Sequence, residues 1–521
     1  MDTKLLKQKI LDLAIHGKLV PQNPNDEPAS KLLEKIREEK QKLIAEKKIK
    51  ADKNDSYIFV GDDNRHYEKF SDGTVKDIED EIPFEVPEGW AWCRLGKICD
   101  FIGGGTPDKS RNDFWNGTIN WASVKDIKGN FLYSTEDKIT EIGLKESSAH
   151  LASKGDIILV TRISPGKAII TQIETTINQD LKIVIPKINL NKQFLLYFFQ
   201  DSESYFIENS SGTTVKGIKL EFLISKLIPL PPLEEQERIV KEIEHSFTLI
   251  NSLEKDKSDL QTAIKQAKSK ILDLAIHGKL VSQDSSDEPA SVLLEKLRAE
   301  KEAKIKAGDL KRDKNDSYIY KNTTDNCYYE KFTGKEPVCI DEEIPFDIPD
   351  NWQWCRLNEL GETNIGLIYH PTDLVNTGVP VLRSNNIQND CLCLDDLARV
   401  QTKILDNQYV ADGDILICAR NGSQALVGKC TLIKNIPEKM AFGAFMAVFR
   451  SKYNDYILRY LQSFYFKDYM RESNSTQIYQ LTQAMLKNAL IPLPPISEQK
   501  RIISKIEEMF KRLDQIQNNL I

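Results

Sequence analysis

A long stretch without helix-breaking residues, 228–281, sets the architecture of this chain. It opens with Ile-Pro-Leu-Pro-Pro-Leu-Glu-Glu-Gln-Glu-Arg-Ile-Val, and no further Pro or Gly occurs before Gly278. Apolar residues then recur at steps of three and four, which is typical of a helix with one apolar face. A proline pair suits the first turn of a helix, and a glycine suits its end. The pattern predicts one helix over 233–276 that needs a partner helix. The apolar positions are Ile239, Ile243, Phe247, Ile250, Leu253, Leu260, Ile264, Ala267, Ile271 and Leu274.

The partner of this helix is encoded in the same chain as two separate pieces. Residues 10–20 are identical to residues 271–281, and residues 491–503 closely match residues 228–240. The apolar spacing carries over with both matches. We therefore expect a second long helix whose first part lies at the C-terminus and whose last part lies at the N-terminus. The chain is a two-copy repeat whose ends fall inside one helix of the second copy.

Paired tryptophans mark the start of the globular part of each copy. Trp-Ala-Trp-Cys-Arg-Leu at 90–95 corresponds to Trp-Gln-Trp-Cys-Arg-Leu at 352–357. Alternation of Trp with small or polar residues predicts a strand with one buried face. Core packing is the main interpretation for these indoles, and base stacking is the alternative.

A charged segment precedes the tryptophans in each copy. Residues 30–50 are rich in Lys and Glu and carry only a thin apolar stripe, which predicts a solvated helix packed weakly on the long helix. The sequence Asp-Lys-Asn-Asp-Ser-Tyr-Ile at 52–58 recurs at 313–319. It predicts a loop that leads into a short strand.

Two globular bodies, 96–227 and 358–490, share a skeleton but little sequence. Each contains Gly-Asp followed by an apolar run that ends close to a basic residue, Arg162 or Arg420, ahead of a Gly-containing turn. Each then has an aromatic-rich stretch, predicted to be one helix, and a small polar loop. The shared skeleton predicts the same fold, and the different surface residues predict different targets. The aromatic-rich stretches are 194–206 and 453–469.

Catalytic motifs are incomplete throughout the sequence. Phe-Ile-Gly-Gly-Gly at 101–105 fits part of an S-adenosylmethionine-binding motif, but no Asn-Pro-Pro-Tyr or Asp-Pro-Pro-Tyr occurs. Residues 422–429 resemble a phosphate loop with one residue too many between the glycines, and Cys430 stands where Ser or Thr is required. The acidic stretch 77–81 lacks the strand and Lys of a nuclease centre, and the six His are isolated. We expect no catalytic centre and no metal site.

The composition limits the class of protein further. A length of 521 residues predicts two to four domains, and 40% apolar residues suffice for their cores. The net charge of −7 gives no global signal for nucleic acid. Nine cysteines without a Cys-x-x-Cys pair predict reduced thiols in a cytosolic protein. No apolar run approaches 18 residues and no signal-peptide cleavage site is visible, so we expect no membrane span.

These features together resemble the specificity subunit of type I restriction–modification enzymes. The resemblance rests on the two Pro-rich helix starts followed by Glu-Gln-(Glu/Lys)-Arg-Ile, the duplication, and the order of the pieces, and it covers nearly the whole chain. It implies an α+β protein with two α/β-mixed target recognition domains, 85–227 and 347–490. An antiparallel coiled coil of two long helices separates them, and a pseudo-two-fold internal repeat relates them. The other segments are then 1–84, 228–281, 282–346 and 491–521.

The resemblance also implies the partners of the chain. They are double-stranded DNA with a bipartite asymmetric target, two methyltransferase subunits and two restriction or motor subunits, in the cytoplasm and without a membrane. The specificity subunit of this family has no catalytic centre and no cofactor of its own. S-adenosylmethionine, ATP and Mg²⁺ are implied for the partner subunits, which form an adenine-N6 DNA methyltransferase and an ATP-dependent endonuclease.

Neither body has an excess of basic residues, so the basic residues must cluster in space or the partner subunits must contribute phosphate contacts. The residues expected to contact DNA lie in loops of the two bodies. Arg can bridge guanine O6 and N7, and Asn or Gln can bridge adenine N6 and N7. Lys, Ser and Thr more often hold phosphates. The expected contacts of the first body are Lys109, Ser110, Arg111, Lys125, Arg162, Lys167, Thr213, Thr214 and Lys216. Those of the second body are Arg383, Asn385, Asn386, Arg420, Asn421, Gln424, Ser475, Thr476 and Gln477.

Two other classes of function stay open at this point. A coiled-coil scaffold whose paired domains bind protein or peptide fits the same pattern, and a gel shift with bipartite duplexes distinguishes it from a DNA reader. A self-contained modification enzyme would require the motifs that are missing.

Overall fold

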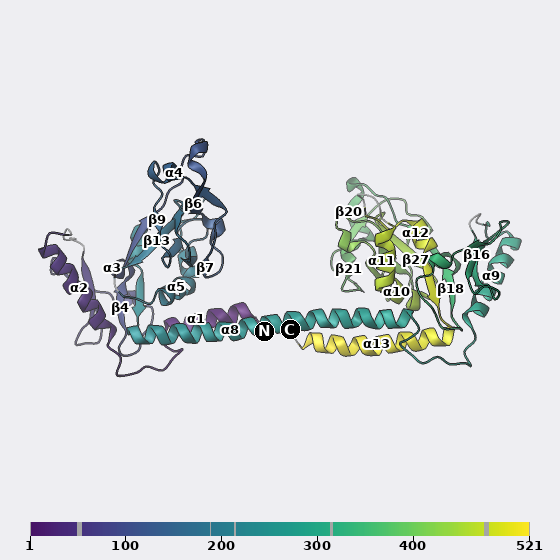
Figure 1. Cartoon of the computed structure of the whole chain (residues 1–521), viewed down its shortest axis with the longest axis horizontal. Helices are drawn as coiled ribbons and strands as arrows, with labels where there is room; N and C mark the ends of the chain where they lie inside the picture. The colour runs from purple at the N-terminus through teal and green to yellow at the C-terminus, as the bar shows by residue number, and fades with distance from the viewer. Residues whose placement is uncertain are drawn as a thin grey trace. The chain divides into compact units, whose positions relative to one another are not determined.

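The structure is a computed structural model in which the chain forms two compact units. Unit 1 is Met1–Asp256 and unit 2 is Lys257–Ile521. Each unit mixes helices and sheets (Figure 1), in agreement with the predicted α and β content. Within the described residues, no helix is long and apolar enough to cross a membrane. The described residues are 2–48, 55–187, 189–212, 215–312, 316–473 and 479–519.

Helix α8 spans Leu233–Ile276, which are the bounds predicted from the sequence. Its 44 residues contribute their first part to unit 1 and their last part to unit 2. It follows Pro232, whose carbonyl accepts the amide N–H of Gln236 at 3.0 Å. At its end Gly278 has φ +65°, and a Cβ there would lie 2.5 Å from Cγ of Pro349. The helix therefore ends at a position that only glycine fits.

A shorter helix lies antiparallel beside α8 in each unit. In unit 1, α1 (Thr3–Ile15) is tied to α8 by Lys7 Nζ, which donates to Asn251 at 2.8 Å. In unit 2, α13 (Ile496–Asn518) is tied to α8 by the ion pair of Lys268 with Asp514 at 2.5 Å. Met1 and residues 520–521, where we expected the two ends of the second long helix, lie outside the described residues.

The apolar face of α8 is buried only in part. In unit 1, Ile239 and Ile243 are fully buried, whereas Leu253 is 53% exposed. In unit 2, Ile264 is buried, whereas Leu260 is 39% exposed. Within each unit, the apolar face is therefore covered chiefly where a globular body packs on the helix.

Two-stranded sheets join each globular body to the start of its long helix. In unit 1, β4 (Ala91–Arg94) pairs antiparallel with β14 (Leu227–Leu230). In unit 2, β18 (Gln353–Arg356) pairs in the same way with β28 (Leu490–Leu493). Strands β14 and β28 were not predicted from the sequence, because a central Pro argues against a strand. A two-stranded sheet tolerates it, since each strand has one unpaired edge.

The paired tryptophans are core residues, as predicted. Trp90, Trp92, Trp352 and Trp354 are all less than 9% exposed. The prediction of one buried face is wrong, however. Trp354 packs against Ile319 of a neighbouring three-stranded sheet, whereas Cys355 belongs to the main core of unit 2. Both faces of the strand are buried because a second sheet covers it.

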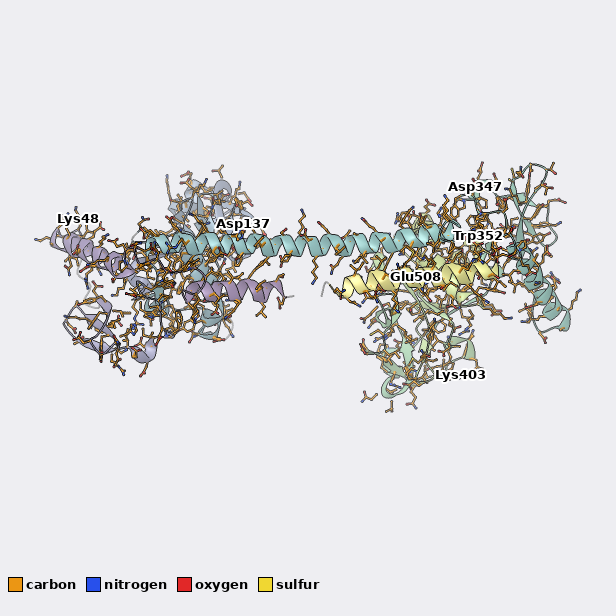
Figure 2. The ribbon with its side chains drawn as sticks, turned by 90° about the horizontal axis from the view of Figure 1, so that it is seen from below. Lys48, Asp137, Asp347, Trp352, Lys403 and Glu508 are labelled. Atoms are coloured by element: carbon orange, nitrogen blue, oxygen red, sulfur yellow. The ribbon has the colours of Figure 1, made fainter. Side chains whose placement is uncertain are left out.

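That second sheet is three-stranded in each unit and follows a charged helix. Helix α2 (Ala29–Ala45) buries only Ala29, in agreement with a solvated helix, and Figure 2 shows Lys48 at its outer end. Helix α9 (Ala290–Ala307) buries Leu293 and Leu294 as well. The strands of unit 1 are β1 (Ser56–Val60), β2 (His66–Phe70) and β3 (Val75–Asp77). Those of unit 2 are β15 (Ser317–Lys321), β16 (Tyr328–Phe332) and β17 (Val338–Cys339).

Two further sheets form the globular body of unit 1. The first has the order β5-β13-β10-β11-β7 and the second the order β8-β6-β12-β9. The central strand β10 is buried along its whole length. The first sheet comprises β5 (Cys99–Gly103), β13 (Leu181–Pro186), β10 (Ile157–Val160), β11 (Ala168–Thr171) and β7 (Phe131–Leu132). The second comprises β8 (Asp137–Ile139), β6 (Trp115–Ala122), β12 (Thr175–Ile177) and β9 (Leu151–Ala152).

The body of unit 2 is built on a similar plan with fewer strands in the first sheet. Its sheets have the orders β19-β27-β24-β25, β23-β20-β26 and β21-β22, and β24 is buried throughout. The first comprises β19 (Glu362–Ile365), β27 (Met446–Arg450), β24 (Ile415–Cys418) and β25 (Cys430–Leu432). The others comprise β23 (Ala398–Val400), β20 (Leu374–Leu382), β26 (Ala441–Phe442), β21 (Ile387–Gln388) and β22 (Cys391–Leu392).

Helices cover the first sheet of each body. Each aromatic-rich stretch, predicted as one helix, forms two, because a serine interrupts it. In unit 2, the hydroxyl of Ser463 accepts the amide N–H of Phe466 at 3.3 Å and caps the second helix. The helices of the unit 1 body are α3 (Leu95–Ile98), α4 (Glu141–Lys145), α5 (Lys192–Asp201), α6 (Glu203–Glu208) and α7 (Leu220–Ser225). Those of the unit 2 body are α10 (Asn454–Gln462), α11 (Phe464–Glu472) and α12 (Gln483–Asn488).

Candidate nucleic-acid interface

The predicted arginines Arg162 and Arg420 occupy equivalent positions in the two units. Each follows the buried central strand of its body, β10 or β24. Arg162 forms an isolated β-bridge with Gly217, and Arg420 forms one with Gln480. Gly217 and Gln480 are separated by 263 residues (480 − 217), the same spacing that relates the two long-helix starts. The fold therefore places one arginine at the same strand end in both units.

In unit 1, three of the predicted basic residues gather at this strand end. The amide N–H of Val160 donates to the carbonyl of Lys167 at 2.8 Å, and that of Ile163 donates to the carbonyl of Lys216 at 2.9 Å. Both lysines are exposed. Arg162 is 47% exposed and forms an ion pair with Asp180 at 3.1 Å. A carboxylate thus holds the guanidinium at the surface.

The turn that carries Asp180 extends this surface. Gln179 accepts a hydrogen bond from the hydroxyl of Thr106, at the end of the glycine-rich segment. The carbonyl of Asp180 accepts the amide N–H of Thr161 at 2.9 Å. Thr106, Gln179 and Asp180 were not predicted from the sequence, because nothing in their local sequence shows that they lie on this surface.

Ile163 follows Arg162 in an unusual backbone conformation. Its φ is +75°, and the amide N–H of Ser164 donates to the carbonyl of Arg162 at 3.0 Å, which closes a three-residue turn. A β-branched residue in this region is an outlier, and such strain costs about 1–3 kcal/mol. The turn that carries Arg162 in unit 1 is therefore strained and lowers the stability of the fold.

In unit 2, the same strand end is assembled differently. The guanidinium of Arg420 lies 5.8 Å from the ring centroid of Phe445, which is 61% exposed. Asn421 donates its side-chain amide to the hydroxyl of Ser384 at 3.1 Å. This contact brings the loop of Arg420 next to the loop of Arg383, and Gln424 is exposed on the same loop as Arg420. Phe445 was not predicted from the sequence, since a Phe within an apolar run predicts a core residue.

The neighbouring loop of unit 2 separates surface residues from a structural one. Arg383 and Asn385 both bind Asp396, at 3.3 and 2.9 Å. Asn386 is 1% exposed, and its amide nitrogen donates to the carbonyls of Cys393 and Asp396 at 3.0 and 2.9 Å. The structure does not support Asn386 as a DNA contact, because both amide hydrogens already bind the backbone.

The remaining predicted residues of unit 1 lie around η2 (Asn112–Phe114) and β8, not at the strand end. Ser110 binds Asp108 at 2.8 Å, and Lys109 is exposed beside it. The hydrogen bond to Asp113, at 2.6 Å, raises the pKa of Arg111 well above its ordinary value. Bonds to Asp137 and then Glu136 raise the pKa of Lys125 in the same way. The positive charges of Arg111 and Lys125 are therefore partly neutralised within the chain.

Five further predicted residues lie outside the described residues: Thr213, Thr214, Ser475, Thr476 and Gln477.

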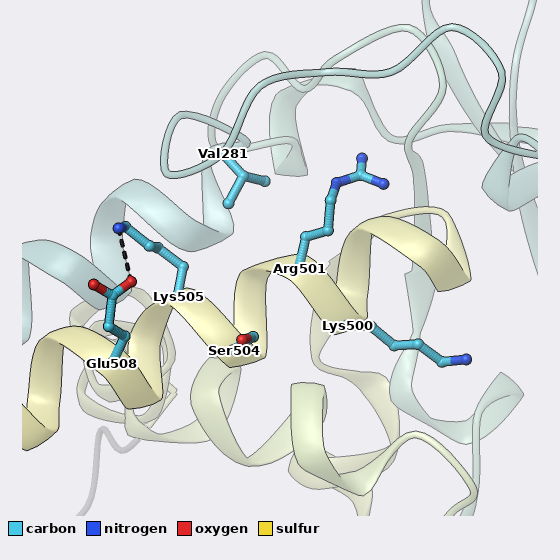
Figure 3. A pocket seen from close by; sticks show the side chains of 6 residues that line it. All are labelled: Val281, Lys500, Arg501, Ser504, Lys505 and Glu508. Atoms are coloured by element: carbon cyan, nitrogen blue, oxygen red, sulfur yellow. Dashed lines mark hydrogen bonds and ion pairs between the residues drawn. The ribbon is translucent and has the colours of Figure 1, made fainter.

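The described residues contain no group of three or more His, Cys, Asp or Glu placed to hold a metal ion. A shallow depression of about 400 Å³ lies along α13 beside Val281 in unit 2 (Figure 3). Its cationic side chains are largely paired, since Lys505 binds Glu508 at 2.9 Å and Arg501 binds Asp287 at 2.6 Å. The depression lies along α13 and not at the loops described above, so it is separate from the candidate interface.

In each unit, an ion-pair cluster with one buried carboxylate links the three-stranded sheet to the globular body. Arg94 Nη2 contacts Glu68 and Glu81, each at 2.7 Å. Arg356 contacts Glu330 and Glu343 at 2.7 and 2.8 Å. Burial raises the pKa of Glu68, but the hydrogen bonds from Arg94 and Ser56 outweigh it and hold that pKa below its ordinary value.

Comparison with known proteins gives a consistent result. The family described as Type I restriction modification DNA specificity domain matches residues 87–261 and 349–521. The EcoAI specificity subunit of Escherichia coli is 27% identical to this chain over 577 aligned positions, which cover 98% of this chain and 90% of the relative. The EcoEI specificity subunit of Escherichia coli is 29% identical, with coverage of 99% and 90%.

A solved structure shares the fold. It comes from work on complex assembly and conformational transition of the type I R-M system, and it aligns with a TM-score of 0.51 and 19% identity. The alignment covers 84% of this chain and 94% of the solved chain. Because two copies of the specificity domain cover more than half of the sequence, the chain belongs to the family of specificity subunits of type I restriction–modification systems.

Proposed function

We propose that the chain reads a bipartite, asymmetric DNA target, with one half-site bound by each unit. As a specificity subunit, the chain binds target DNA and is itself non-catalytic. The observation that carries the proposal is the equivalent placement of Arg162 and Arg420 on differing loops. Equivalent strand ends would meet two half-sites in the same way, whereas different neighbouring side chains would read different bases.

The residues proposed to face DNA are the exposed predicted residues around the two strand ends. In unit 1 they are Arg162, Lys167 and Lys216, and in unit 2 they include Arg420 and Gln424. Arginine is the side chain best suited to guanine, and lysine to phosphate. Lys109, Ser110, Arg111, Lys125, Arg383, Asn385 and Asn421 stay predictions, as do the expected residues outside the described part of the chain.

The long helices are proposed to set the gap between the half-sites. The antiparallel contacts of α1 and α13 with α8 support a two-helix spacer related by a pseudo-two-fold repeat. Inserting one or two helical turns within 245–265, together with the matching turns of the second helix, is expected to lengthen the gap while both half-sites persist. An unchanged gap would rule out the helices as the spacer.

The complex proposed around this chain contains two methyltransferase and two restriction or motor subunits. The near-identity of the repeated segments supports two copies of one partner, because equal surfaces bind equal partners. S-adenosylmethionine, ATP and Mg²⁺ are proposed for those partner subunits and none for this chain. We expect the complex to act in the cytoplasm.

The test is a gel shift with the methyltransferase partner present. Duplexes selected from a random library are expected to share two conserved half-sites separated by an unspecified gap of fixed length. Binding that shows no sequence preference, or that is displaced by protein or peptide and not by duplex DNA, would favour the scaffold alternative.

A further inference from the structure

Ile163 combines two features that a side chain rarely shows together. It is 57% exposed, although it is large and apolar. It also holds φ at +75°, a conformation that favours Gly or Asn. Among the described residues other than glycine that have positive φ, the rest are Asn, Asp or Lys, and Ile163 alone is β-branched.

The contacts of Ile163 fix the backbone and leave the side chain outside. The amide N–H of Ile163 donates to the carbonyl of Lys216 at 2.9 Å, and its neighbours close the three-residue turn. Ile163 is absent from the buried clusters of unit 1, so packing does not explain the strain. The turn instead presents an apolar group between Arg162 and Lys216, at the strand end proposed to face DNA.

An apolar group in a DNA major groove has one chemical partner that distinguishes bases. Thymine carries a 5-methyl group there, whereas the other bases present only hydrogen-bonding groups and ring C–H. We propose that Ile163 is a specificity-determining residue that contacts the 5-methyl group of a thymine in the half-site read by unit 1. This inference rests on the proposed function.

Unit 2 supplies a natural comparison at the equivalent position. The residue after Arg420 is Asn421, whose side chain is bound to Ser384 at 3.1 Å and whose φ is not positive. The two units thus differ in polarity at this position, as modules that read different bases would.

The experiment compares the wild-type chain with Ile163→Gly, each with the methyltransferase partner, on selected target duplexes. Each thymine is replaced in turn by uracil, which lacks only the methyl group. The wild type is expected to lose about threefold to tenfold in affinity at one thymine of the unit 1 half-site, the scale of burying one methyl group. Ile163→Gly keeps the positive φ and is expected to bind the thymine and uracil duplexes equally.

Three results would overturn the inference: no thymine required in that half-site, no uracil effect in the wild type, or the same uracil effect in Ile163→Gly. Uracil substitution in the other half-site is the control and is expected to affect both proteins alike. Denaturant unfolding shows whether Ile163→Gly is folded, and a more stable variant with lost thymine preference agrees with strain held for recognition. Failure of the wild type to select any sequence would instead contradict the proposed function.

Discussion

The two units share the ion-pair cluster around Arg94 and Arg356 and differ at the strand ends that carry Arg162 and Arg420. In these clusters, Arg94 and Arg356 make matching contacts, including hydrogen bonds to the carbonyls of Ser225 and Asn488 at 3.0 and 2.9 Å. At the strand ends, Arg162 is held by a carboxylate, whereas Arg420 lies beside an exposed aromatic ring.

The equivalence of these partners extends to the backbone. The carbonyl of Asp180 accepts the amide N–H of Thr161, and the carbonyl of Phe445 accepts that of Ala419, both at 2.9 Å. Asp180 and Phe445 therefore occupy the same position in the fold with opposite chemistry. The backbone holds each arginine at the same position, while the side chain beside it differs between the two units.

The largest expected effect comes from breaking the ion-pair cluster that the two units share. Replacing Arg94 or Arg356 by Ala leaves Glu68 or Glu330, each about 6% exposed at the side chain, as an unpaired buried carboxylate. We expect a loss of about 3–5 kcal/mol in the free energy of unfolding of the affected unit. Urea unfolding measures it. Equal losses in the two units would confirm the equivalence, and a loss in one unit alone would contradict it.

A pH-dependent difference is expected from Glu359, which has a lysine, Lys97, at the matching position of unit 1 (359 − 262). Burial raises the pKa of Glu359 to about 7, and its Oε2 lies 3.9 Å from Arg298 without a hydrogen bond. Because folding raises the pKa of this carboxyl, its protonated form stabilises the fold. This contribution is complete at pH values below its ordinary pKa of 4.5. That contribution is lost as the pH rises through about 7.

Glu359→Gln should therefore remove a fall in the stability of unit 2 between about pH 4.5 and pH 7. At pH 8 the variant should be more stable than the wild type by about 2–4 kcal/mol. Urea unfolding at a series of pH values measures both effects. A wild type whose stability in unit 2 does not change over this range would show that Glu359 is ionised in the fold.

The strand-end arginines provide the direct test of the difference between units. Arg162→Ala and Arg420→Ala are each expected to cost about 1–3 kcal/mol in binding to the target if the arginine contacts a base. Each should relax one half-site only. Equal losses on target and random DNA would instead assign a phosphate contact. Asp180→Asn removes the ion pair in unit 1 and should alter only the half-site that depends on Arg162.

The smallest expected effect separates two adjacent asparagines of unit 2. Asn386→Ala removes three hydrogen bonds to the backbone, two donated and one accepted, and should lower the stability of unit 2 by about 1–2 kcal/mol. Asn385→Ala is the matched control, because the side chain of Asn385 binds the exposed Asp396, and the stability of unit 2 should hardly change. If Asn386→Ala is neutral for stability but weakens DNA binding, our structural assignment of Asn386 is wrong.

The sequence by itself determined the repeat, the bounds of α8, the buried tryptophans and the strand-end position of both arginines. These follow from short-range patterns, since helix periodicity, proline placement and a buried apolar run each leave a local signature. The family was indicated by resemblance, through the Pro-rich helix starts followed by Glu-Gln-(Glu/Lys)-Arg-Ile, the duplication and the order of the pieces.

Only the tertiary structure decided which loops share a surface. Asp180 reaches Arg162 and Ser384 reaches Asn421 across 18 and 37 residues (180 − 162 and 421 − 384), and local sequence carries no signal for such pairs. The burial of Asn386 and the strain at Ile163 were likewise invisible, because a side chain's exposure and its backbone angle depend on what packs around it. The β14 and β28 strands escaped prediction for the same reason, since a partner strand overrode the local signal of proline.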